Sequence, residues 1–402
     1  MGIGARGGWA GCPRARTGGV SWAVRAALLV VLVNVTVSAR AAEAQAIRPE
    51  EYVVSTFTEH DIVFLGEMHY VKQNLDFLIG LIPRLYEAGV YNLGYEFASY
   101  QEQVLIDHLI TAPTYDRELA HTILLRWRDP RIGRIWGFQE YADVFRAAWE
   151  LNHRLPRGAR PFRIVALNWS ADTDWPILAP KNAPADMDWP LISPKHSLAA
   201  GKQVLARRFQ AGDLHWRKVI MEEFVLRGDK ALIYCGSGHT ATRFFDDRGP
   251  QYGNTTGNYI YRILGDRVMR LSLHGSESGG VTQAVEDLIR QLGLATSPFG
   301  LDLRGMEFGK ISLSGRKGYL DGRSSGFTLE DITDGYVFLV PASQWQPVTL
   351  IPDIVTQQNR WLVQMSLREF RPGDPELSVD EINRLLAKKL RDDLARQTKT
   401  LR

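Results

Sequence analysis

The stretch Ile62-Val63-Phe64-Leu65-Gly66-Glu67-Met68-His69 decides the fold class, because an apolar run of strand length ends directly in two side chains suited to chemistry. A short continuous apolar run is typical of a strand buried on both faces of a parallel sheet. The carboxyl ends of parallel strands share one edge, and open α/β sheets bind ligands in the crevice outside that edge. We therefore expect Glu67 and His69 to lie where a ligand binds.

Four further apolar runs end in polar residues in the same way. They are residues 90–95 before Glu96, 163–167 before Asn168, 231–235 before Gly236-Ser237-Gly238-His239, and 268–273 before His274. Helical spacing of apolar residues lies between these runs, over 74–88, 138–152 and 197–226. Alternating strands and helices predict an α/β fold with a mostly parallel central sheet flanked by helices.

A near-duplicated, proline-rich segment interrupts this rhythm. Asp174-Trp175-Pro176 returns as Asp188-Trp189-Pro190, each within an eight-residue motif. Proline at these positions excludes a helix interior, so the segment is expected to be a loop insertion after the third strand. We expect Trp175 and Trp189 to cover a ligand there. The alternative is a duplicated surface loop without a role.

The C-terminal segment, residues 297–402, is expected to be an extension that packs on the core. Residues 335–340 read as one more strand. Ser378 and Glu381 have capping-box spacing at the start of a final helix. Its apolar stripe consists of Ile382, Leu385, Leu386 and Leu394. The expected division is therefore a signal peptide over 1–46, an α/β domain over 47–296 and this extension.

The first 46 residues are typical of a secretory signal peptide. Arginines precede an uncharged stretch over 26–39, and a small-residue tail ends at Ala46. The apolar stretch is shorter than the roughly 20 residues of a membrane-spanning helix. We therefore expect an exported protein, periplasmic or extracellular, with no stable membrane span after cleavage. An uncleaved anchor is the alternative.

Charge and cysteine content narrow the class of protein. Without residues 1–46, Lys and Arg fall from 48 to 43 and Asp and Glu from 45 to 44, which leaves a net charge near −1. Nucleic-acid binding needs a concentrated basic patch, so no such partner is expected. Cys235 is then the one cysteine left, which excludes an internal disulfide. Its apolar surroundings predict a buried residue rather than a nucleophile.

The candidate catalytic residues are Glu67, His69, Glu96 and His239. Imidazole and carboxylate groups suit a divalent metal, and Glu67, His69 and His239 form the set that could hold one. The same groups can act without metal, since a histidine can take a proton from water while a carboxylate orients it. A lone Glu after a strand is more typical of a helix cap, and His239 could simply start the next helix, so the hypothesis rests on the joint position of these residues at strand ends.

Further ligand-binding residues follow from the same edge. Gly236 and Gly238 allow a tight turn in which the backbone approaches a ligand closely. Asn168 and His274 are included because each directly follows a strand. The sequence around Ser237 does not have the Gly-x-Ser-x-Gly pattern of a nucleophile elbow.

These motifs resemble a known family. The segments 65–69, 94–97 and 233–240 are similar to those of ChaN-like haem-binding uptake proteins, which belong with the Tiki/TraB and erythromycin-esterase-like proteins. The resemblance covers roughly residues 55–275. It implies a small-molecule ligand, either haem, bound in the Glu/His pocket of an iron-uptake protein, or the ester or amide substrate of a hydrolase that uses the same residues. The resemblance is compatible with a homodimer.

Departures from the family keep both functions open. The chain has no lipobox cysteine near the cleavage site, and the Trp-Pro duplication and the extension are additional. No motif identifies a haem-ligating tyrosine or histidine. A haem binder needs an apolar slot and an axial ligand, whereas a hydrolase needs a Glu/His cluster that water can reach.

We predict that the exported protein begins at or near Ile47, because cleavage after Ala46 best fits the small-residue tail, with Ala44 the next choice. Mass spectrometry of the secreted or periplasmic protein measures this end. An intact Met1 in the membrane fraction would contradict the prediction.

Overall fold

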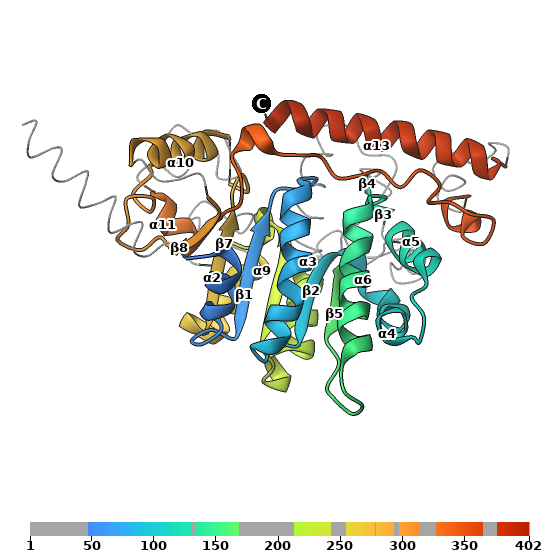
Figure 1. Ribbon diagram of the computed structural model, residues 1–402, viewed down its shortest axis with the longest axis horizontal. Coiled ribbons are helices and arrows are strands. Elements are labelled where there is room, and N and C mark those ends of the chain that lie inside the picture. Colours follow the sequence, from blue (N-terminus) through green and yellow to red (C-terminus); the bar gives the residue numbers. More distant parts are fainter. Residues whose placement is uncertain are drawn as a thin grey trace, which may run out of the picture.

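The computed structural model is centred on a seven-stranded sheet between layers of helices (Figure 1). It describes residues 47–126, 128–129, 134–168, 213–242, 255–277, 279–292, 297–313, 327–364 and 376–401. The strands are β1 (Ile62–Glu67), β2 (Asn92–Ser99), β5 (Arg163–Asn168), β6 (Ala231–Gly236), β7 (Val268–Leu273), β8 (Phe299–Asp302) and β9 (Gly335–Phe338). The predicted mostly parallel α/β sheet is confirmed.

The strand order is β5-β2-β6-β1-β7-β9-β8, and every pairing is parallel except that of β8 with β9. The chain passes from β1 outward to β2 and β5, and then returns to insert β6 between β2 and β1. The central strands β2, β6 and β1 therefore come from distant parts of the sequence. Glu67 pairs in register with Gly236, and Tyr95 pairs with Tyr234. Glu96 therefore directly follows Tyr95, the last residue of β2 that pairs with β6.

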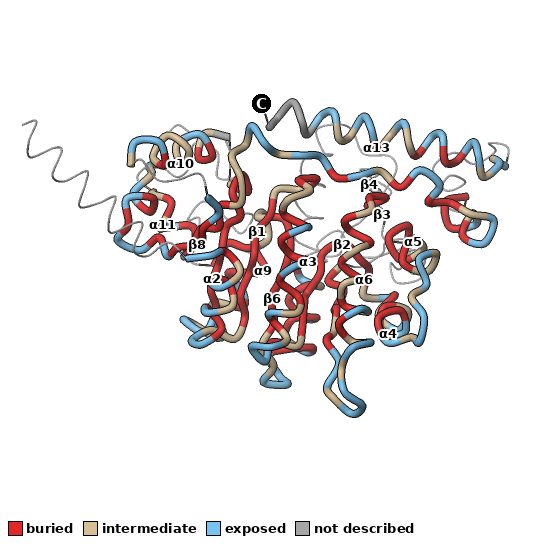
Figure 2. Tube along the Cα trace, viewed as in Figure 1, coloured by how far each residue is buried: buried red, intermediate tan, exposed pale blue. Residues whose placement is uncertain are grey.

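Both faces of the sheet are covered, so most residues of its strands are buried (Figure 2), and most of them are apolar. Val63 and Leu65 pack toward one face, and the alternate residues Ile62 and Phe64 pack toward the other. Side chains alternate between faces along a strand, so Glu67 lies on the same face as Val63 and Leu65.

Helices from both halves of the chain form the two outer layers. The face that holds Glu67 is covered by α3 (Lys72–Glu87) and α6 (Gln139–Arg154). The other face is covered by a helix over residues 213–223 and by α9 (Thr256–Leu264). The remaining helices are α2 (Pro49–Thr56), α4 (Gln103–Thr111), α5 (Arg117–Arg126), α10 (Gly279–Gln291), α11 (Leu329–Ile332) and α13 (Val379–Leu401). β3 (Arg128–Asp129) pairs antiparallel with β4 (Arg134–Ile135).

The C-terminal segment completes the sheet as well as covering it. β8 and β9 extend the sheet beyond β7, and the final helix α13 joins the main core through Ile382, Leu386 and Leu390. Ser378 and Glu381 form the expected capping box, with the Ser378 backbone N–H 2.8 Å from the Glu381 carboxylate. Leu385, expected in the apolar stripe, is half exposed because it lies beside the buried face. The expected boundary at residue 297 stays a prediction.

Two of the three helices expected between the strands are present over nearly their whole length. The helices expected over 74–88 and 138–152 are present as α3 and α6. Of the helical stretch expected over 197–226, the described part is helical over 213–223 and continues as a 3-10 turn, η2 (Val225–Arg227). Cys235 is buried, as expected. The Trp-Pro duplication lies outside the described residues.

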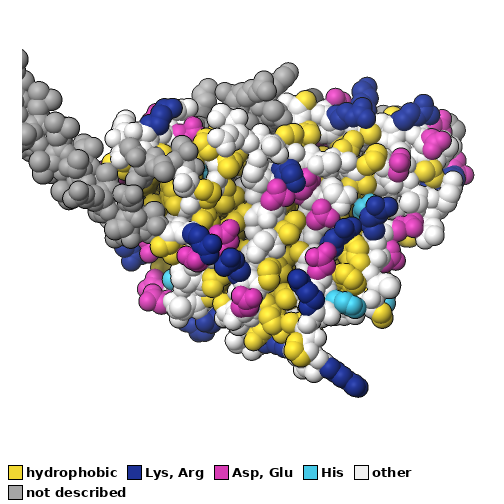
Figure 3. All heavy atoms as spheres, viewed as in Figure 1, with side chains coloured by type: hydrophobic (Ala, Val, Ile, Leu, Met, Phe, Trp, Pro, Cys, Tyr) yellow, Lys and Arg dark blue, Asp and Glu magenta, His cyan; other side chains and the backbone are white. Residues whose placement is uncertain are grey.

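The helices and the surface of the described residues bear on membrane and nucleic-acid partners. No helix in the described ranges is long and apolar enough to cross a membrane. On the face drawn in Figure 3, Lys and Arg side chains lie among Asp and Glu side chains.

The central strand supplies a stability test. Val63→Asp places a carboxylate at a fully buried position of β1, so we expect the free energy of unfolding to fall by at least about 3 kcal/mol. Val104→Asp is the matched control, because Val104 is 80% exposed on α4 and should tolerate the charge. Denaturant titration of both variants measures the difference. Equal stability of the two variants would contradict this account of β1.

Candidate functional site

The carboxyl ends of the three central strands bring the first candidate residues together. β1 supplies Glu67, β2 supplies Glu96 and β6 supplies Gly236. His69 follows β1 by two residues and lies between the two carboxylates. A crevice at this edge, where the chain reverses its direction across the sheet, is the usual binding position of an open α/β sheet.

Glu67 is a buried carboxylate surrounded by hydrogen-bond donors. Its Oε1 is 2.6 Å from His69 Nδ1, and its Oε2 accepts a hydrogen bond of 2.8 Å from the Tyr234 hydroxyl. Tyr141 also hydrogen-bonds to the carboxylate. Burial raises the pKa of Glu67 well above its ordinary value, and the two tyrosine hydrogen bonds act in the opposite direction.

The contact with Glu67 orients the His69 ring. An ionised Glu67 only accepts hydrogen bonds, so its partner Nδ1 carries the proton and Nε2 carries the lone pair. Nε2 lies 4.0 Å from Oε1 of Glu96. This separation is too long for a direct hydrogen bond and suits one water molecule bonded to both groups.

Glu96 is held in turn by the backbone of β6. Its Oε2 accepts a hydrogen bond of 2.6 Å from the Gly236 N–H, which leaves Oε1 on the side of His69. Glycine is required at position 236, because a Cβ there would lie 2.7 Å from Cε1 of His69. Gly236 was expected to let the backbone approach a ligand closely. In the structure it lets the backbone approach the His69 ring.

Aromatic rings pack around His69. Its ring centroid lies 5.0 Å from that of Trp136 and 5.7 Å from that of Phe97, both edge to face. Trp136 and Phe97 are fully buried, while 17% of the His69 side chain remains exposed. Buried aromatic rings therefore pack against the His69 ring, while a small part of its side chain remains exposed.

The residue after His69 has an unusual backbone. Tyr70 has φ of +70°, a region that non-glycine residues seldom adopt. The Tyr141 hydroxyl accepts a hydrogen bond from the Tyr70 N–H, and the Tyr70 carbonyl accepts one from the Val348 N–H, both of 3.1 Å. Side-chain and backbone partners thus hold the turn that presents His69.

Val348 belongs to residues 344–351, which we call the crossing segment. It runs over the N-terminal ends of α3 and α6, where Lys72 N–H donates to the Gln346 carbonyl and Gln139 N–H donates to the Thr349 carbonyl, each at 2.8 Å. Figure 1 shows this part of the chain above the carboxyl edge of the sheet. The C-terminal segment therefore helps to position His69.

His239 lies in the 3-10 turn η3 (Ser237–His239) directly after β6, and Gly238 is in the same turn. Its Nδ1 is 3.3 Å from Asp213 Oδ1, and its ring packs on Trp216 at 4.1 Å. Burial lowers the pKa of His239, but the charges of Asp213 and Glu96 outweigh it, so the pKa is raised overall. The effect of Glu96 places His239 within electrostatic reach of the first cluster.

Asn168 links the residues around His69 to the residues around His239. Its side-chain amide donates to the Glu96 carbonyl, and its Oδ1 accepts a hydrogen bond of 3.0 Å from Trp216 Nε1. The structure thus brings Glu67, His69, Glu96, Gly236 and Asn168 together at the carboxyl edge. Their functional roles stay predictions.

His274 belongs to a different set of contacts. Its Nδ1 bonds to the Tyr336 hydroxyl at 2.8 Å and its Nε2 contacts Glu286 at 3.2 Å. Burial lowers the pKa of His274. The ring therefore ties β7 to β9 and α10, so the structure does not add it to the cluster around His69. Trp175 and Trp189 lie outside the described residues.

The residues fit a metal or haem less well than they fit proton transfer. Among the described residues, no three His, Cys, Asp or Glu side chains are grouped so that they could hold a metal ion. At His69, a carboxylate of Glu96 faces the Nε2 that would ligate haem iron. This position does not fit an axial haem ligand.

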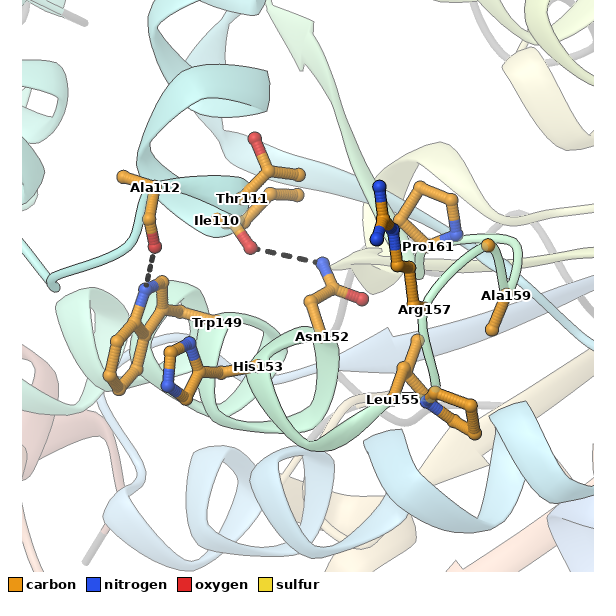
Figure 4. Close-up of a pocket in the computed structure, with 12 residues that line it drawn as sticks. Ile110, Thr111, Ala112, Trp149, Asn152, His153, Leu155, Arg157, Ala159 and Pro161 are labelled. Atoms are coloured by element: carbon orange, nitrogen blue, oxygen red, sulfur yellow. Dashed lines mark hydrogen bonds between the residues drawn. The ribbon is translucent and has the colours of Figure 1, made fainter.

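A pocket of about 290 Å³ lies at the opposite end of α6, toward the amino ends of the strands (Figure 4). Its polar groups already serve the fold. Asn152 donates to the Ile110 and Phe162 carbonyls, and Trp149 Nε1 donates to the Ala112 carbonyl at 2.7 Å. It offers no cluster of acid and base groups.

Several residues of the site were not expected from the sequence. Tyr141, Tyr234, Trp136, Asp213 and Trp216 contact the expected Glu and His side chains. Tyr234 could have been predicted from the sequence. Its side chain lies on the same face of the sheet as Glu67, and it pairs with Leu65, two residues before Glu67. Asp213 could not, because its partners are 26 and 43 residues away.

Several solved structures are similar to this protein in fold. No protein-family model matches the sequence. No curated protein matches it either. A succinoglycan biosynthesis protein superposes with a TM-score of 0.53 at 13% identity, over 80% of this chain and 99% of that one. A protein of Bacillus cereus superposes with a TM-score of 0.51 at 11% identity, over 79% and 99%. At these identities the likeness concerns the fold alone.

ChaN of Campylobacter jejuni, described with cofacial haem binding, is also similar. It superposes with a TM-score of 0.34 at 15% identity, over 57% of this chain and 90% of that one. Membership of the ChaN-like family stays a prediction.

Gly236 supplies a test of the packing in the site. In Gly236→Ala the added methyl group meets the His69 ring, so we expect about 1–3 kcal/mol of destabilisation from overpacking. Gly80→Ala is the control, because a Cβ at Gly80 of α3 meets nothing within 4 Å and alanine favours a helix by about 0.5–1 kcal/mol. Denaturant titration measures both. A Gly236→Ala variant as stable as the parent would contradict the close approach.

Proposed function

We propose that this protein is a hydrolase that activates water for attack on an ester or amide. The observation that carries the proposal is the order Glu67, His69, Glu96, in which His69 contacts one carboxylate through Nδ1 and faces the other with Nε2 at 4.0 Å. A base oriented by one group and close to the proton that it removes is the arrangement that general base catalysis needs.

Each residue has a distinct part in the proposed reaction. Glu67 holds the Nδ1–H tautomer and stabilises the imidazolium that forms when Nε2 takes a proton from water. Glu96, fixed by the Gly236 N–H, orients that water from the other side. The crossing segment and Tyr141 hold the backbone turn on which His69 depends.

Haem binding, the expectation drawn from the family resemblance, stays a second candidate through His239. A histidine that ligates a metal usually gives its other ring nitrogen to a carboxylate, and Asp213 occupies that place beside His239. A haemin titration followed by absorbance distinguishes this candidate. A saturable shift that His239→Ala removes and His69→Gln leaves unchanged would favour the haem binder.

The hydrolase makes a specific prediction on pH. Proton removal by His69 requires an ionised Glu67, and burial raises the pKa of that carboxyl. The rate should therefore be lost as the pH falls through a value above the ordinary Glu range. A pH–rate profile on a panel of 4-nitrophenyl and alkyl esters measures this limb.

His69→Gln and Glu67→Gln should each lower kcat by about 10²–10⁴-fold. His153→Gln is the control, since His153 lines the pocket at the opposite edge and should leave the rate unchanged. Ester hydrolysis that persists at the parent rate in His69→Gln would contradict the proposal, and so would its absence from the parent protein over the whole panel.

A further inference from the structure

Asp213 is a buried acidic residue near the proposed site, and the mechanism above does not use it. It lies at the start of the helix over 213–223 and is almost fully buried. Its Oδ1 accepts a hydrogen bond of 2.8 Å from the Thr256 N–H at the start of α9, and the Thr256 hydroxyl also donates to it. The carboxylate is therefore fixed by another helix, independently of His239.

The same oxygen of Asp213 contacts His239 Nδ1 at 3.3 Å. Trp216, one turn along the helix, packs its ring on His239 at 4.1 Å and an interplanar angle of 33°. Trp216 is itself held by Asn168, which bonds to the Glu96 carbonyl. The ring of His239 is thus fixed from its edge by Asp213 and from its face by Trp216.

We propose that Asp213 and His239 form a second carboxylate–histidine pair, in which His239 is the general acid that protonates the leaving group and Asp213 is its positioning residue. The inference rests on the proposed hydrolase and adds the acid that such a reaction needs. A carboxylate on Nδ1 turns Nε2, on the far side of the ring, away from Asp213 and stabilises the imidazolium. The charges of Asp213, from the helix over 213–223, and of Glu96, from β2, both raise the pKa of His239.

The proposed step balances without a further reactant. His69 Nε2 takes one proton from water as the new carbon–oxygen bond forms at the carbonyl. The bond from that carbon to the leaving oxygen or nitrogen then breaks, and His239 gives its Nε2 proton to the departing atom. The products are a carboxylic acid and an alcohol or amine. The proton on His69 returns to His239 through solvent, which restores both residues.

This division of roles favours substrates with poor leaving groups. An alkoxide or amide ion needs a proton as it departs, whereas 4-nitrophenolate departs without one. The substrate class that we infer is therefore an alkyl ester or an amide rather than an activated ester.

The pair is tested first without substrate. In the full-length protein, nitrogen NMR of the histidine side chains should show His239 titrating above its ordinary range, and about 1–3 pH units lower in Asp213→Asn. Asp287→Asn is the matched control, because Asp287 is partly exposed on α10 and contacts Gln283 and Arg290 of the same helix. An unchanged His239 titration in a folded Asp213→Asn would overturn the pair. If Asp213→Asn does not fold, Thr256→Val takes its place: loss of the hydroxyl donor leaves more negative charge on Oδ1 of Asp213, so His239 should titrate at the same pH or higher, and a lower value would overturn the pair.

The role as an acid is tested by comparing two leaving groups. With ethyl butyrate, Asp213→Asn and His239→Gln should lower kcat by at least about 10-fold more than with 4-nitrophenyl butyrate. Equal losses on both esters would overturn the acid role while leaving the proposed hydrolase intact. Parent protein that hydrolyses neither ester would instead contradict the proposed hydrolase, and the NMR titration would still decide whether Asp213 sets the state of His239.

Discussion

The buried contact between Glu67 and His69 is the constraint on which the rest of the site depends. A carboxylate without solvent is tolerated in a protein only when donors surround it. Here the fold supplies a tyrosine from β6, a tyrosine from α6 and the imidazole itself. These partners come from three separate parts of the chain, so the contact can form only when the sheet and the α6 layer have assembled.

The sequence predicted the sheet well because buried parallel strands have an unmistakable composition. The run ending at Glu67 and the run ending at Gly236 are continuous apolar segments, and the structure pairs them in register. The convergence of Glu67, His69, Glu96 and Gly236 at one edge then follows from parallel geometry alone. Asn168 joins them by the same logic, although its contacts are with the Glu96 backbone and Trp216.

The positions of Asp213 and of the crossing segment could not be predicted from any periodic pattern in the sequence. Asp213 acts through partners in η3 and α9, and no spacing rule connects those segments. The crossing segment pairs with α3 and α6 through backbone atoms, which sequence patterns do not reveal. His274 satisfies the positional rule at the end of β7, but in the structure its two ring nitrogens contact Tyr336 and Glu286, so its expected role in ligand binding stays a prediction.

The central claim is that His69 carries its proton on Nδ1, toward Glu67, and directs a lone pair on Nε2 toward a water shared with Glu96. Neutron diffraction from crystals of the protein in deuterated buffer near neutral pH locates these hydrogens directly. The account predicts a deuteron on Nδ1, an ionised Glu67 and a water molecule bonded to both Nε2 and Oε1 of Glu96. A deuteron on Nε2, with Glu67 protonated and donating to Nδ1, would contradict it.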